Sequence, residues 1–164
     1  MEKPKKPIVV AVSGGFDPIH IGHIRMFERA KALGDKLVVI LNNDNWLVAK
    51  KQHIFMPDYE RKEVIEGLRA VDEVVLTGHS MNPPGPAEMS VRAELAAIKP
   101  DIFANGGDRN ERNATDSASS LYWDINTCKE LGIEMVFNIG DGGKIQSSSW
   151  LLQDYLKKAS GEKE

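Results

Sequence analysis

Apolar residues fall along the chain in short blocks separated by polar turns. Five blocks have the length of strands, and the first two are rich in β-branched residues, as is typical of strands buried in a parallel sheet. These blocks span 8–12, 37–41, 73–76, 101–104 and 134–139. Between and after them, apolar residues recur every three or four positions, as Ile24, Phe27 and Ala30 do, which predicts helices. The helical segments span 20–33, 58–70, 91–98, 117–131 and 147–158.

This alternation of strand and helix predicts a doubly wound, Rossmann-like α/β fold with a five-stranded parallel sheet, because parallel neighbours require crossover connections. No repeat or shift in composition divides the chain, so we expect one domain over residues 1–164 with a flexible tail at 1–7. Ligands of such sheets bind beyond the carboxyl ends of the strands. The loops expected at that edge are 13–22, 42–51 and 105–113.

The composition excludes several classes of protein. With 41% hydrophobic residues and a net charge of −3, a chain of 164 residues can bury a core and is not disordered. The acidic residues (24) outnumber the basic ones (21), which argues against the positive surface that nucleic-acid binding requires. The apolar stretches are too short to span a membrane, and the lone Cys128 cannot form an internal disulfide. We therefore expect a cytoplasmic protein without nucleic-acid or membrane partners.

The loop after the first strand carries the most informative residues. It lacks the G-x-G-x-x-G fingerprint of a dinucleotide-binding dehydrogenase and instead places His20 and His23 three positions apart at the start of a helix. Side chains three apart are neighbours on one turn, so both imidazoles can donate N–H groups to the same phosphate. Gly22 lets that phosphate approach the backbone closely. The alternatives are a zinc-binding pair, or two polar residues that only begin the helix.

Residues 20–23 read H-I-G-H, and this segment resembles the HxGH signature of the nucleotidyltransferase superfamily. Residues 144–148, K-I-Q-S-S, are similar to the second signature of the related class I aminoacyl-tRNA synthetases, but 164 residues leave no room for a tRNA-binding synthetase. The resemblance extends from Val9 to Leu152. It implies a catalytic role for both histidines and a nucleotide-binding role for four residues of the loop. These four are Gly15, Phe16, Asp17 and Gly22, with an N-cap as the alternative for Asp17.

Two basic segments extend the resemblance. Lys50 and Lys51 precede a tyrosine-glutamate-arginine helix start, and Arg69 follows eight residues after Arg61, as in cytidylyltransferases. Eight residues on a helix bring both guanidinium groups to one face, where they can bind phosphates. The resemblance implies a catalytic role for Lys50 beside the α-phosphate. It also implies that the acceptor and its phosphate are bound by Lys51, Arg61 and Arg69. The alternative is that all four are solvated surface charges.

Two polar segments complete the expected site. Gly107 and Asp108 resemble the glycine-x-aspartate loop that borders the nucleotide in this superfamily, and we expect Arg109 on the acceptor side; a plain turn is the alternative. Three hydroxyls and the unpaired N–H groups of the last helix form a seat for the β- and γ-phosphates, whereas one serine alone would be a routine N-cap. These hydroxyls belong to Ser147, Ser148 and Ser149.

The resemblance implies transfer of CMP or AMP from CTP or ATP to a small phosphorylated acceptor, with release of pyrophosphate. The Arg61 segment slightly favours CTP and a glycerol-phosphate-like acceptor; ATP with a heptose or other sugar phosphate comes second, and FMN third. The cofactor expected is Mg²⁺, held through the triphosphate without a direct protein ligand. The resemblance also implies a homodimer. From a different class, a non-catalytic nucleotide-binding module remains the alternative.

Overall fold

The computed structural model describes residues 1, 4–107, 109, 115–140 and 145–161. In this part of the chain, five strands form one parallel sheet in the order β3-β2-β1-β4-β5. The strands are β1 (Val9–Gly14), β2 (Lys36–Leu41), β3 (Glu73–Leu76), β4 (Ile102–Ala104) and β5 (Glu134–Val136). The α/β fold class predicted from the sequence is confirmed. Strand order reverses between β1 and β4, which is where ligands of doubly wound sheets bind.

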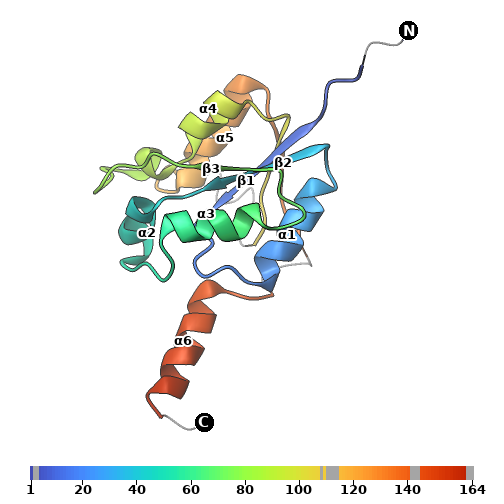
Figure 1. Ribbon diagram of the computed structural model, residues 1–164. Coiled ribbons are helices and arrows are strands. Elements are labelled where there is room, and N and C mark those ends of the chain that lie inside the picture. Colours follow the sequence, from blue (N-terminus) through green and yellow to red (C-terminus); the bar gives the residue numbers. More distant parts are fainter. Residues whose placement is uncertain (2–3, 108, 110–114, 141–144, 162–164) are drawn as a thin grey trace.

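Helices cover both faces of the sheet (Figure 1). On one face lie α1 (Ile21–Lys31) and α3 (Asp58–Glu66), and on the other lie α4 (Arg92–Ile98) and α5 (Ser120–Leu131). The remaining helices are α2 (Asp44–Lys51), the short 3-10 helix η1 (Pro86–Met89) and α6 (Ser148–Ala159). The last of these, α6, projects away from the sheet (Figure 1).

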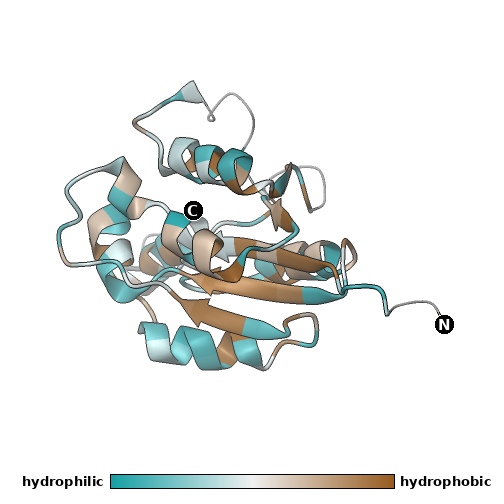
Figure 2. Ribbon diagram, turned by 90° about the horizontal axis from the view of Figure 1, so that it is seen from above, coloured by the Kyte–Doolittle hydropathy of each residue, from teal (hydrophilic) through white to brown (hydrophobic). Residues whose placement is uncertain are grey.

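Side-chain alternation along β1 separates the core into two layers. Val10 and Val12 pack with Phe27 of α1, whereas Ala11 belongs to the opposite cluster with Leu95 of α4. Figure 2 shows the strands as a hydrophobic layer between the two layers of helices. The sheet is therefore buried on both faces, which leaves the edge formed by the strand ends for ligands.

The structure differs from the sequence prediction most clearly over residues 42–51. This segment was expected as a loop, but it contains α2. Asn43 caps the helix by accepting a hydrogen bond from the N–H of Trp46 (3.0 Å), and the side chains of Trp46 and Leu47 are buried. In addition, α3 and β5 are shorter than predicted. None of the described helices has the length and apolar composition that crossing a membrane requires.

Candidate active site

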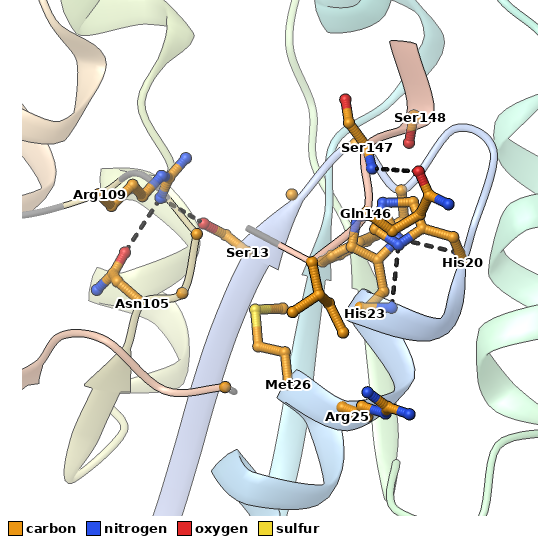
Figure 3. Close-up of a pocket in the computed structure, with 18 of the residues that line it drawn as sticks. Ser13, His20, His23, Arg25, Met26, Asn105, Arg109, Gln146, Ser147 and Ser148 are labelled. Atoms are coloured by element: carbon orange, nitrogen blue, oxygen red, sulfur yellow. Dashed lines mark hydrogen bonds between the residues drawn. The ribbon is translucent and has the colours of Figure 1, made fainter. Parts of the chain in front are cut away.

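A pocket of about 350 Å³ opens at the carboxyl ends of β1 and β4 (Figure 3). Its wall is built from the loop after β1, the first turn of α1, the loop after β4 and the start of α6. Eleven of the predicted site residues line it. They are Gly15, Phe16, His20, Gly22, His23, Lys51, Gly107, Arg109, Ser147, Ser148 and Ser149.

The two histidines form a reciprocal cap at the start of α1. Nδ1 of His20 accepts a hydrogen bond from the Gly22 N–H (3.1 Å), and Nδ1 of His23 accepts one from the His20 N–H (3.3 Å). The rings stack with their centroids 3.6 Å apart. Because each Nδ1 acts as an acceptor, the proton of each neutral ring lies on Nε2. The helix cap thus selects the tautomer that carries its proton, and its donor, on Nε2.

The surroundings of His23 keep its imidazole neutral. Burial, the neighbouring His20 and the positive charge of Lys51, in that order of size, together lower the pKa of His23 to about 3. The edge of Phe16 packs against the ring, with centroids 4.9 Å apart, and Phe16 in turn contacts Phe27. At neutral pH, His23 therefore presents a fixed N–H donor rather than a cation.

The start of α6 supplies a second group of donors. The Ser148 hydroxyl donates to the Pro18 carbonyl (2.8 Å), which ties the helix to the loop that carries the histidines. Ser147 and Ser148 are buried, and Figure 3 shows both above His20 and His23. The first N–H groups of a helix have no partner within it, and its dipole favours negative charge. The histidine pair and this turn therefore line one pocket from two segments far apart in sequence.

The opposite side of the pocket is held by a buried polar cluster. The Arg109 guanidinium donates to the Asn105 side-chain oxygen (3.2 Å) and to the Ser13 hydroxyl (3.4 Å), at the ends of β4 and β1 (Figure 3). Burial lowers the pKa of Arg109, but an arginine stays charged in proteins. Burial also raises the pKa of Asp124 to about 6, against the opposing effects of Arg109 and of the hydrogen bond from the Val91 N–H. Arg109 thus brings a fixed positive charge to the pocket wall.

A glycine shapes the pocket at the end of β4. A Cβ atom on Gly106 would lie 2.8 Å from the Ile139 carbonyl oxygen and 2.8 Å from Met26 Sδ, both closer than real Cβ contacts allow. Gly106→Ala should therefore displace this wall and weaken binding of the nucleoside triphosphate expected from the sequence by about tenfold, as overpacking forces the backbone to shift. Calorimetric titration with ATP and with CTP measures this. Gly78→Ala is the control, because that Cβ meets nothing within 4 Å; equal nucleotide affinity for both variants contradicts the prediction.

One lysine of the predicted pair reaches the pocket. Lys51 lines it and lies close enough to His23 to lower the pKa of that ring, whereas Lys50 is exposed and does not line the pocket. Consecutive residues on a helix point about 100° apart, so only one of the two side chains can face the ligand. We therefore assign to Lys51 the position expected for Lys50.

Arg61 and Asp17 were expected to bind the substrates, but both are buried in the protein and neither lines the pocket. Arg61 is 1% exposed; its Nη1 donates to the carbonyl oxygens of Gly15 (2.6 Å) and Asn42 (2.8 Å), and its Nη2 binds the Asp44 carboxylate (2.7 Å). Its donors are occupied by protein oxygens, so it supports the loops rather than a phosphate.

Asp17 is fully buried and, like Arg61, holds loops of the protein in place. Its carboxylate accepts hydrogen bonds from the N–H groups of Phe55 and Met56, both at 2.7 Å. It does not line the pocket and is not an N-cap, since His20 caps α1. The nucleotide-binding role expected for Asp17 is therefore replaced by a link between two loops.

Arg69 does not line the pocket. Because α3 ends at Glu66, the eight-residue helical spacing between Arg61 and Arg69 does not hold, and Arg69 lies in a separate small hollow beside Phe27. Asp108 lies outside the described residues. Sequence reasoning missed several lining residues, of which Ile145 and Gln146 lie in the K-I-Q-S-S segment and could have been found there. The missed residues are Ser13, Gly14, Arg25, Met26, Trp46, Ala104, Asn105, Gly106, Ile139, Gly140, Ile145 and Gln146.

Over the described ranges, no group of three or more His, Cys, Asp or Glu side chains is arranged to hold a metal ion. His20 and His23 both use Nδ1 for backbone hydrogen bonds. Binding of Mg²⁺ through the phosphates of a ligand stays a prediction.

Comparison with known proteins identifies the family of the chain. A sequence model of the cytidylyltransferase-like family matches residues 11–120. The FAD synthase of Thermococcus kodakarensis is 37% identical over 110 residues, which are 66% of this chain and 68% of that protein. The FAD synthase of Ferroglobus placidus is 39% identical over 101 residues, 62% of this chain and 60% of that protein.

Among solved structures, a lipopolysaccharide core biosynthesis protein from Thermoplasma volcanium superposes with a TM-score of 0.61 and 27% identity, covering 85% of this chain and all of that one. Pantothenate synthetase from Thermus thermophilus, at 17% identity and a TM-score of 0.52 over 82% of this chain and 56% of that one, shares the fold. The chain belongs to the cytidylyltransferase-like family and is a nucleotidyltransferase.

Proposed function

We propose that this nucleotidyltransferase transfers AMP from ATP to FMN, forming FAD and releasing pyrophosphate. The observation that carries the proposal is the single pocket shared by the two Nε2–H donors of His20 and His23 and the start of α6. Such a pocket suits a polyphosphate. The choice of ATP and FMN is supported by the relatives named FAD synthase, which are 37% and 39% identical to this chain.

This proposal replaces the preference for CTP and a glycerol-phosphate-like acceptor. That preference depended on the Arg61 segment, and Arg61 is occupied by protein oxygens. A sugar phosphate is the second acceptor to test with ATP, because the lipopolysaccharide core biosynthesis protein is 27% identical to this chain.

The reaction needs positioning and charge stabilisation more than acid-base chemistry. An oxygen of the FMN phosphate attacks the α-phosphorus of ATP, the new P–O bond forms, and the bond to the bridging oxygen of the β-phosphate breaks. The Nε2–H groups of His20 and His23 donate to the α-phosphate oxygens, where negative charge grows in the transition state. Lys51 holds the attacking phosphate beside them, and the first turn of α6 binds the pyrophosphate that leaves. Mg²⁺ bound to the triphosphate would neutralise part of its charge.

A substrate matrix tests the proposal. The purified protein is incubated with ATP or CTP and with FMN, glycerol 3-phosphate or a heptose phosphate, and pyrophosphate and nucleotide products are measured. We expect pyrophosphate and FAD in equal amounts with ATP and FMN. Turnover only with CTP and glycerol 3-phosphate overturns the proposal. Thermal stabilisation by ATP without pyrophosphate release in any combination supports the non-catalytic alternative. The homodimer and the cytoplasmic location stay predictions; sedimentation and cell fractionation test them.

A further inference from the structure

Exposed apolar side chains gather in the segment between α2 and α3. Ile54 is 39% exposed and Phe55 is 56% exposed, and both belong to the loop of residues 52–57. The flanking helices add two more exposed apolar residues, Val48 and Tyr59. Single exposed apolar residues are ordinary on a protein surface, but neighbouring ones often mark a binding surface.

The backbone of the 52–57 loop is held firmly in place. Asp17 accepts hydrogen bonds from the N–H groups of Phe55 and Met56, and Arg61 Nε donates to the Met56 carbonyl at 2.8 Å. The loop thus presents its exposed side chains from a fixed backbone, and such a loop loses little backbone entropy when it binds a ligand.

The same hydrogen bonds place the loop next to the pocket. Asp17 follows Phe16, which lines the pocket, and the hydrogen bond to Asp17 limits the Cα–Cα distance between Asp17 and Phe55 to roughly 8 Å. At the other end, the loop follows directly from Lys51, which also lines the pocket. The Ser148 hydroxyl ties the start of α6 to Pro18, the residue after Asp17.

The pocket is small for a reaction with two substrates. Its volume of about 350 Å³ lies near the lower end of the range for small-molecule sites, roughly 300–1,000 Å³. In the proposed reaction, the triphosphate lies between the histidines and α6, and Lys51 holds the acceptor phosphate beside the α-phosphorus. A large ring on that acceptor would extend past Lys51, the residue that the 52–57 loop follows in the chain.

We propose that Ile54 and Phe55 bind the planar ring of the acceptor while Lys51 holds its phosphate. This assignment rests on the proposed function, since it takes FMN as the acceptor. It identifies the 52–57 loop as the part of the site that selects an acceptor with an apolar, planar ring over a phosphorylated polyol. Asp17 is then a positioning residue that fixes this loop against the pocket.

The test separates acceptor binding from nucleotide binding. The KM values for FMN and for ATP are measured for Phe55→Ala, Ile54→Ala and wild type. Binding of FMN in the absence of ATP is measured from the quenching of flavin fluorescence. We expect Phe55→Ala to raise the KM of FMN about tenfold, as loss of an aromatic stacking partner does, with the KM of ATP unchanged. Phe55→Tyr, which keeps an aromatic ring, should have the KM of wild type for FMN. Met81→Ala is the matched control, because Met81 is an exposed apolar residue of the loop before η1 and does not line the pocket.

The outcomes distinguish this proposal from the proposed function. If wild type forms FAD and Phe55→Ala has an unchanged KM for FMN and unchanged quenching, the 52–57 loop does not bind the ring, and the function stands. An equal rise in the KM of ATP and FMN also overturns the proposal, because the loop then only supports the pocket. If wild type forms no FAD and does not quench flavin fluorescence, the proposed function fails together with the ring site.

Discussion

His23→Ala should lower the rate of pyrophosphate release by on the order of 10²–10³-fold, as loss of one preorganised transition-state donor does. The Nε2–H of His23 is fixed in three ways: its Nδ1 accepts the His20 N–H, its ring stacks on His20, and Phe16 packs against its side. A donor held in this way needs no rearrangement as charge develops on the phosphate. Steady-state kinetics with ATP and FMN measures the loss.

His23→Asn separates this catalytic role from the capping role of the same side chain. Asparagine places an oxygen near the position of Nδ1, so it can accept the His20 N–H and preserve the start of α1, but it has no group at the position of Nε2. We expect this variant to unfold at the temperature of wild type and to be as slow as His23→Ala. A rate equal to that of wild type contradicts the assignment.

The depressed pKa of His23 sets the pH dependence. Since the folded-state pKa is about 3 and the unfolded-state value is 6.5, the unfolded chain binds the proton more readily. The contribution of His23 to stability is therefore present above pH 6.5 and declines as the pH falls toward 3. Between pH 8 and pH 5, protonation of His23 should not reduce the rate. The prediction is contradicted if the rate of wild type falls with an apparent pKa near 6.5 and the rate of His23→Asn does not.

The sequence predicted the sheet well because its signal is local. The runs around Val10 and Val38 consist of β-branched and aliphatic residues, and such residues form buried strands whatever the rest of the chain does. The HxGH segment and the serine turn were also visible, because their chemistry depends on the residue types themselves. Both reach the same pocket through the parallel topology, which brings strand ends to one edge of the sheet.

The errors came from interactions that leave no trace in the residue types. Gly106 and Ile139 shape the pocket through backbone atoms, and the choice between Lys50 and Lys51 depends on the rotation of α2 about its axis. The charge of Arg61 suggested a phosphate ligand, yet its partners are mostly backbone carbonyl groups of three separate segments. A one-dimensional pattern does not show which carbonyl groups will meet in space.

The buried position of Arg61 predicts a large loss of stability. Arg61→Met keeps much of the side-chain volume but leaves the carbonyl oxygens of Gly15, Asn42 and Met56 without this donor and the Asp44 carboxylate without its cation. Removing one partner of a buried charged network costs about 3–5 kcal/mol. For a chain of this size, that loss lowers the melting temperature by roughly 10 °C. Thermal and urea denaturation measure both quantities.

Arg69→Met is the matched control, because Arg69 is exposed and lies outside the pocket. We expect it to change stability by less than about 0.5 kcal/mol, as surface substitutions usually do. If Arg61 instead bound a phosphate, Arg61→Met would keep the melting temperature of wild type and lose affinity for ATP or the acceptor. The support role predicts the reverse order of effects: stability falls first, and turnover falls with it, because Arg61 links the Gly15 loop to the 52–57 loop.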